Sequence, residues 1–155
     1  MTPFIVESVD ALQDSVGKEI GVSDWLVVTQ DRINAFADAT GDRQWIHLDT
    51  EMAKRESPFG QTIAHGFLTL SLLSHLIQRT VQIRAGSRLA VNYGLNRVRF
   101  PAPVREGSRI RGHFTLASFK DLADYYEAIF DCSVECEGSE KPACVAEWIV
   151  RYFKR

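Results

Sequence analysis

The fold is decided by the segment Gly66-Phe67-Leu68-Thr69-Leu70-Ser71-Leu72-Leu73-Ser74-His75-Leu76-Ile77. No charged residue occurs between Glu56 and Arg79. Apolar side chains at this density fall on nearly every face of a helix, which predicts a helix that is buried all round. Pro58, Gly60 and several hydroxyl groups in the same stretch suit a buried helix better than a membrane span.

The chain after this helix alternates between apolar and polar residues, as half-exposed strands do. The alternation is regular over residues 109–116 and 126–137, and residues 89–100 and 143–153 predict two further strands. Gly94 indicates a bulge or a close backbone approach in the first of these two. Because no helix separates the four strands, we expect an antiparallel sheet whose apolar face packs on the long helix, an α+β fold.

The segments before the long helix carry shorter signals. Gly21–Val28 is rich in β-branched and aromatic residues and predicts a strand. Ser8, ahead of Val9–Leu12 and with Gly17 beyond, predicts a first short capped helix. Thr29 predicts the N-cap of a second helix that ends near Gly41. A third short helix fits Thr50–Glu56, begun by Asp49 or by Thr50 itself. The sequence therefore places helices first and a sheet after them.

Composition limits the class of protein. The 155 residues include 18 basic and 20 acidic side chains, a formal net charge of −2, and 45% are hydrophobic. This length and apolar content predict one globular domain over residues 1–155. The charge disfavours a nucleic-acid binder driven by overall charge.

The cysteines and the N-terminus bear on the compartment. Three cysteines without a Cys-x-x-Cys pair argue against a disulfide framework and against a zinc cluster. The first residues lack a basic region followed by an apolar one, which argues against a secretory signal. We expect a soluble, cytoplasmic protein with reduced thiols at Cys132, Cys136 and Cys144.

Asp42 and His47 stand five positions apart, just after a predicted helix end. A carboxylate and an imidazole held near one water molecule can share its activation, since histidine titrates near neutral pH. Spacing alone leaves the structural alternatives open, in which the aspartate is a solvated turn residue and the histidine a packing residue.

Ile63-Ala64-His65-Gly66 leads into the long helix, whose first N–H groups have no partner within the helix. Gly66 has no side chain to keep a substrate carbonyl away from its N–H, as an oxyanion site requires. Close packing at the helix start would also explain this glycine. For the side chain of His65 we favour a capping or packing role.

Three stretches taken together carry a family resemblance: ATGDRQWIHLD (39–49), IAHGFL (63–68) and YGLNRVRFPAPV (93–104). In this order they resemble the MaoC-like dehydratases, the group that contains the (R)-specific enoyl-CoA hydratases and the NodN-like proteins. The resemblance covers the chain from about residue 20 to residue 155, and several motifs in sequence are more specific than one. Gln44-Trp45 replaces an Asn-Pro of many hydratases, as in the NodN-like branch, which puts the acyl-chain preference in doubt.

This resemblance implies a hot dog fold, in which an antiparallel β-sheet wraps a long apolar central helix, and a homodimer whose two sheets join. It implies a hydro-lyase that adds water to a trans-2-enoyl thioester of coenzyme A or acyl carrier protein. Asp42 and His47 are then the catalytic dyad, and Ser74 supports the site. The substrate contacts are Ile63, Ala64, His65 and Gly66.

The chemistry matches these parts. Water adds to C3 while the thioester carbonyl gains enolate character, so one group takes a proton, one supplies a proton to C2, and a donor holds the oxygen. The Gly66 N–H would be that donor. Which of Asp42 and His47 performs each proton step stays open. The thioester supplies the acidity, so we expect neither a metal nor a redox cofactor.

An arginine-rich stretch from Arg79 to Arg111 holds eight arginines, no lysine and one acid. Arginine suits phosphate recognition, and coenzyme A or a phosphopantetheine carrier presents phosphates. Solvated strand faces explain several of the eight, and we select Arg97 and Arg99 as candidate phosphate contacts.

Two rival functions remain. A hot dog acyl-CoA thioesterase usually needs a carboxylate at the central helix, and residues 57–80 contain none, although Glu51 or Glu56 could approach. A non-catalytic acyl-thioester-binding partner subunit would keep the fold without turnover; the presence of both Asp42 and His47 argues against it.

Overall fold

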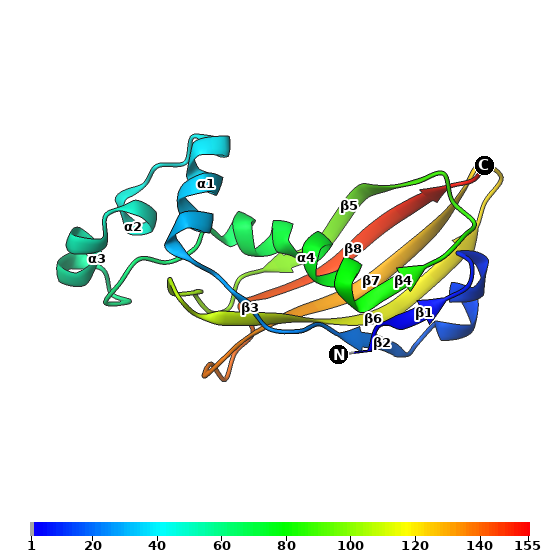
Figure 1. The fold of residues 1–155 in the computed structure, drawn as a ribbon, viewed down its shortest axis with the longest axis horizontal. Helices are drawn as coiled ribbons and strands as arrows, with labels where there is room; N and C mark the ends of the chain where they lie inside the picture. Colours follow the sequence, from blue (N-terminus) through cyan, green and yellow to red (C-terminus); the bar gives the residue numbers. More distant parts are fainter. Residues whose placement is uncertain (1) are drawn as a thin grey trace.

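The computed structural model describes residues 2–155, and its main feature is a six-stranded antiparallel sheet with one long helix on its inner face (Figure 1). The strand order is β2-β6-β7-β8-β5, with β3 also paired to β6. The strands are β2 (Glu19–Val22), β3 (Leu26–Val27), β5 (Leu89–Arg99), β6 (Arg109–Asp121), β7 (Tyr125–Cys136) and β8 (Cys144–Phe153). The predicted α+β class, the four long strands and their antiparallel pairing are confirmed.

The inner face of β6 explains why a glycine interrupts its apolar residues. Ile110, Phe114 and Leu116 are fully buried. A Cβ on Gly112 would lie 2.7 Å from the Phe114 ring and 3.3 Å from Leu76 of the long helix. Only glycine therefore lets the helix and the Phe114 ring approach this strand so closely.

The long helix, α4 (Gly66–Thr80), lies across the sheet and buries one side against it (Figure 1). Leu68, Leu72 and Leu76 belong to the buried core. The prediction of burial all round is wrong, because Phe67 is 68% exposed and Ser71 is also exposed. One sheet covers only one side of a helix, so the opposite side is open in a single protomer.

β5 forms one edge of the sheet, and both of its faces are largely exposed. Its register against β8 shifts between Asn92 and Gly94, which confirms the predicted irregularity at Gly94. Exposed apolar side chains follow one another along this edge strand: Leu89, Val91, Tyr93 and Leu95.

A lobe of three helices extends beyond one end of the sheet (Figure 1). It contains α1 (Gln30–Thr40), α2 (Trp45–Leu48) and α3 (Thr50–Glu56). Thr29 Oγ1 accepts a hydrogen bond from the Arg32 amide at 3.2 Å, Gly41 ends α1 with φ 79°, and Asp49 caps α3. The caps predicted at Thr29 and Asp49 and the stop at Gly41 are therefore confirmed, while the single turn of α2 was not predicted.

The N-terminal part differs more from the sequence prediction. The strand expected over Gly21–Val28 is divided into β2 and β3. A second sheet pairs β1 (Phe4–Val6) in parallel with β4 (Val81–Ile83), and η1 (Asp10–Ser15) is a 3-10 helix. Within residues 2–155, no helix has the length and apolar character needed to cross a membrane.

Candidate active site

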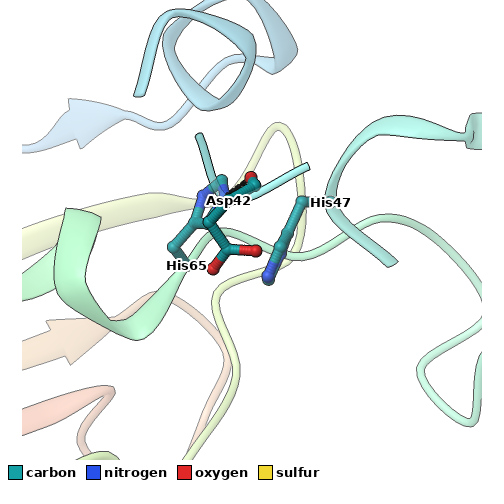
Figure 2. Close-up of side chains that lie close together, drawn as sticks. All are labelled: Asp42, His47 and His65. Atoms are coloured by element: carbon teal, nitrogen blue, oxygen red, sulfur yellow. Dashed lines mark hydrogen bonds between the residues drawn. The ribbon is translucent and has the colours of Figure 1, made fainter. Parts of the chain in front are cut away.

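Three side chains from separate segments meet beside the first turn of α4: Asp42, His47 and His65 (Figure 2). Asp42 lies in the turn after α1, His47 lies in α2, and His65 directly precedes α4. One carboxylate oxygen and one nitrogen from each imidazole all lie within 4.8 Å of one another. The fold thus brings together two predicted catalytic groups and one predicted substrate contact.

Asp42 is exposed and its side chain is weakly held. The left-handed Gly41 turns the chain out of α1, so that the carboxylate projects from the turn. Asp42 Oδ1 lies 3.5 Å from the Gln44 amide, and the Asp42 amide lies 3.4 Å from Thr40 Oγ1. A shorter hydrogen bond is made by the backbone carbonyl of Asp42, which accepts from His65 Nε2 at 2.9 Å.

His47 is buried, and its ring orientation follows from one hydrogen bond. His47 Nδ1 lies 2.7 Å from the carbonyl oxygen of Ile63. A carbonyl can only accept, so Nδ1 carries the ring proton and Nε2 keeps a lone pair. The imidazole is therefore placed as a proton acceptor.

Two residues outside the predicted site hold the backbone of His47. Gln30 Nε2 donates to the His47 carbonyl at 2.7 Å, and the fully buried Thr62 hydroxyl donates to Gln30 Oε1 at 2.6 Å. Sequence reasoning missed both. The position of Thr62 beside the 63–68 motif was the only local signal, and nothing in the sequence pairs it with a residue 32 positions away.

Burial lowers the pKa of His47 below the ordinary value for histidine. The hydrogen bond to Ile63 and the charge of Asp42 oppose this shift, while the neighbouring His65 adds to it. The net direction keeps His47 neutral at pH 7, in the form that can accept a proton.

His65 is buried against both members of the pair. Its ring stacks on His47 with centroids 3.8 Å apart and planes at 27°, and Phe36 lies 5.0 Å away on the ring centroids. Of the two roles predicted for this side chain, packing agrees with these contacts, whereas capping does not, because the side chain makes no cap bond to α4. Its Nδ1 atom is buried without a hydrogen-bond partner among residues 2–155.

Two histidines and a carboxylate are also a common ligand set for metal ions. The spacing here meets that requirement, since one ligand atom from each of Asp42, His47 and His65 lies within 4.8 Å of the others. His47 Nδ1 and His65 Nε2 already meet carbonyl oxygens, so a metal ion would have to use the other ring nitrogen of each histidine. The expected absence of a metal therefore stays a prediction.

Gly66 begins α4 under the ring of Phe100. A Cβ on Gly66 would lie 3.2 Å from that ring, so close packing is one reason for this glycine. The amides of Ile63 and Ala64 already donate to carbonyls of Ile46 and Val104, at 3.1 and 2.8 Å. These two residues therefore have no spare backbone donor for a substrate, and the N–H of Gly66 stays the predicted oxyanion contact.

Ser74 does not join the cluster within one protomer. It lies about two turns further along α4 and lines a cavity of about 360 Å³ between the helix and the sheet. Asn92 and Trp148 line the same cavity, with Trp148 Nε1 donating to Asn92 Oδ1 at 3.2 Å. A supporting role for Ser74 at Asp42 stays a prediction that this geometry does not favour.

The two selected arginines lie on the edge strand β5. The guanidinium of Arg97 is paired with Glu147, whereas Arg99 is exposed and bonds the Val98 carbonyl next to it. Arg99 directly precedes Phe100 and so lies nearer the start of α4. Arg109 and Arg111 pair with glutamates on the outer sheet face, as the solvated-face interpretation predicts.

The two glutamates considered for a thioesterase, Glu51 and Glu56, lie on α3 and not on α4. Glu51 lies on α3 and pairs with Lys54 at 2.8 Å, and Glu56 is exposed at the end of the same helix. Neither glutamate therefore joins the cluster of Asp42, His47 and His65 beside the start of α4.

The fold and the site together define a class: an antiparallel sheet around a central helix, with a carboxylate and an imidazole at the start of that helix. Comparison with known proteins agrees, because the family described as "MaoC like domain" matches residues 11–128. The chain belongs to this MaoC-like dehydratase family. This membership confirms the predicted family and the predicted enzyme class, a hydro-lyase.

Individual relatives give the same result. The "3-hydroxyacyl-thioester dehydratase Z" of Mycobacterium tuberculosis H37Rv is 54% identical over 94% of this chain and 96% of its own length. Nodulation protein N of Rhizobium leguminosarum is 47% identical over 86% of this chain and 84% of its own. The solved R-hydratase PhaJ1 of Pseudomonas aeruginosa has a TM-score of 0.71 at 21% identity, over 90% and 83% of the two chains. That similarity concerns the fold alone, and the predicted hot dog fold is confirmed.

Proposed function

We propose that this protein is an (R)-specific enoyl-CoA hydratase, or 3-hydroxyacyl thioester dehydratase in the reverse direction, that uses Asp42 and His47 as its catalytic dyad. The observation that carries the proposal is the bond from His47 Nδ1 to the Ile63 carbonyl, which leaves Nε2 as the proton-accepting nitrogen of a ring that lies beside the Asp42 carboxylate. The names of the mycobacterial relative and of the solved hydratase support the reaction class.

The proposed step balances without any other reactant. Asp42 and His47 hold one water between them, and one of the pair takes a proton from it as the oxygen bonds to C3. The double-bond electrons move toward the thioester carbonyl, and one of the pair donates a proton to C2. The pair gains one proton from water and loses one to C2, so its total number of protons is unchanged at the end of the step.

The N–H of Gly66 completes the proposed site. Negative charge develops on the thioester oxygen, and a preorganised donor at the positive end of a helix stabilises that charge. α4 is long enough to present such a dipole, and Gly66 directly follows His65 of the cluster. In this proposal the dyad acts on the double bond while the helix start holds the carbonyl oxygen.

The proposal extends to partners and location. The substrate is a thioester of coenzyme A or acyl carrier protein, with Arg99 as the better placed of the two arginines for its phosphates. The exposed apolar edge of β5 supports a homodimer in which two sheets join, because such an edge is otherwise open to pairing. The three buried free cysteines are consistent with a cytoplasmic location.

The test is to follow loss of the enoyl absorbance with crotonyl-CoA and longer trans-2-enoyl-CoAs while measuring free thiol. We expect enoyl loss without thiol release and a product of (R) configuration. Asp42→Asn should lower kcat at least about 100-fold, since acid–base groups contribute about 10²–10⁴-fold. Its stability should stay unchanged because the hydrogen bond that the Asp42 carboxylate accepts from the Gln44 amide is long, at 3.5 Å.

Asp49→Asn is the matched control. Asp49 is another exposed carboxylate of the lobe, and it caps α3 through the Met52 amide at 2.8 Å, a role that asparagine also fills. It should keep full activity. Thiol release would show a thioesterase, and no turnover at any chain length would point to a binding subunit; either result contradicts the proposal.

A further inference from the structure

We propose that His65 is a positioning residue that holds the dyad in place against the start of α4. The inference rests on the proposed function and deepens its site. The His65 side chain then has a structural role in the site instead of contacting the substrate. Its ring contacts Asp42 and His47, and its backbone leads directly into Gly66.

The need for such a connection follows from the architecture. Asp42 and His47 belong to the helical lobe that extends beyond the sheet, whereas Gly66 belongs to the helix packed on the sheet (Figure 1). The distance between the dyad and the oxyanion donor therefore depends on how the lobe is attached. His65 is adjacent to Gly66 in sequence and reaches Asp42 across 23 positions (Figure 2).

The contact to Asp42 is the stronger part of this attachment. His65 Nε2 lies 2.9 Å from the Asp42 carbonyl oxygen, so this nitrogen must carry the proton and donate it. The hydrogen bonds of the Asp42 amide and carboxylate are longer, at 3.4 and 3.5 Å. Among the hydrogen bonds of Asp42 itself, the one from His65 is therefore the shortest. The same turn is also held locally by the Gly41 amide, which donates to the Ala37 carbonyl at 2.8 Å, and by the Arg43–Asp38 ion pair. Of these contacts, only the bond from His65 connects the turn to the start of α4.

The unpaired nitrogen of His65 argues that the ring is not merely a filler. Only 3% of the residue is exposed, and Nδ1 has no partner within the described chain. A buried polar atom without a partner destabilises the fold, and an apolar side chain of similar size would avoid that cost. The hydrogen bond to Asp42 is what an apolar side chain could not supply.

The His65 ring also contacts the second member of the dyad, His47, by stacking on its ring. The two rings lie 3.8 Å apart, and their hydrogen bonds require opposite tautomers, Nδ1–H in His47 and Nε2–H in His65. His65 therefore limits the movement of the His47 ring along the stacking direction, while Ile63 fixes the ring in its own plane. A displacement of about 1 Å in such a site can lower the rate about 100-fold.

The test compares two substitutions of similar length. His65→Gln keeps an N–H donor near the Asp42 carbonyl, whereas His65→Met has none. We expect kcat to fall about 100-fold in His65→Met and less than about tenfold in His65→Gln, with KM within about threefold of wild type in both. His75→Gln, a histidine about three turns further along α4 and outside the site, should match wild type.

A spectroscopic measurement reads the same geometry without turnover. In ¹⁵N spectra of the histidine rings, we expect the Nε2–H tautomer for His65 and the Nδ1–H tautomer for His47, with signals assigned from the variants. An Nδ1–H tautomer at His65 would overturn the proposal. So would equal kcat in His65→Gln and His65→Met, or a His65→Met enzyme as active as wild type. Failure of the wild type to hydrate any enoyl thioester would instead count against the proposed function.

Discussion

Thr62→Val tests whether the support beneath His47 matters for stability and for rate. The substitution keeps the side-chain shape and removes the hydroxyl that donates to Gln30 Oε1 at 2.6 Å. Thr62 is only 1% exposed, so water cannot replace this donor, and losing it should cost about 1–2 kcal/mol. For a chain of this size that lowers Tm by roughly 2–8 °C. Because Gln30 then holds the His47 carbonyl less firmly, kcat should fall about tenfold, equivalent to about 1.4 kcal/mol in the barrier.

Thermal unfolding followed by circular dichroism and the enoyl assay measure the two effects. Thr80→Val is the control, because Thr80 is also buried and its hydroxyl donates to the Leu76 carbonyl at 2.6 Å within its own helix. That carbonyl keeps its helical partner, so Tm and kcat should change little. If Thr62→Val keeps the kcat and Tm of the wild type, or changes them no more than Thr80→Val does, the Thr62–Gln30 hydrogen bond does not support His47 as argued.

Three other predictions concern packing, protonation and the thiols. Gly112→Ala should lower the free energy of unfolding in urea by about 1–3 kcal/mol, because its Cβ would overlap the Phe114 ring. Gly94→Ala is the control and should be nearly neutral, because its Cβ would lie 3.9 Å from Ile149. Equal losses in the two variants would contradict the prediction. Because burial lowers the pKa of His47, kcat/KM should decline only below pH 6.5, where the imidazole gains a proton. A decline of kcat/KM that begins above pH 6.5 as the pH is lowered would contradict this prediction. Burial raises the pKa of the thiols of Cys132, Cys136 and Cys144, so a disulfide reagent at pH 8 should label these cysteines only after the protein is unfolded. Rapid labelling of the native protein would contradict this prediction.

The sequence by itself determined the features that depend on neighbouring residues. Thr29, Gly41 and Asp49 mark helix boundaries because a cap or stop is made within three or four positions. The alternation along β6 and β7 predicted which face is buried, since a strand has a fixed period of two. The 39–49 and 63–68 motifs also located the segments that meet at the site.

Tertiary structure decided everything that depends on distant partners. The parallel pairing of β1 with β4, the open side of α4 and the placement of Ser74 away from the cluster follow from how the chain closes on itself. The roles of Gln30 and Thr62 were invisible for the same reason.

His65 shows the distinction most clearly. Its place in a motif was evident from the sequence, but its stacking on His47 and its bond to Asp42 join residues 18 and 23 positions away. A hydrogen bond requires two atoms within about 3 Å, and no pattern of side-chain types along the chain specifies which distant pair comes that close. The sequence determined which groups can do the chemistry, and the folded chain decided which of them hold each other in position.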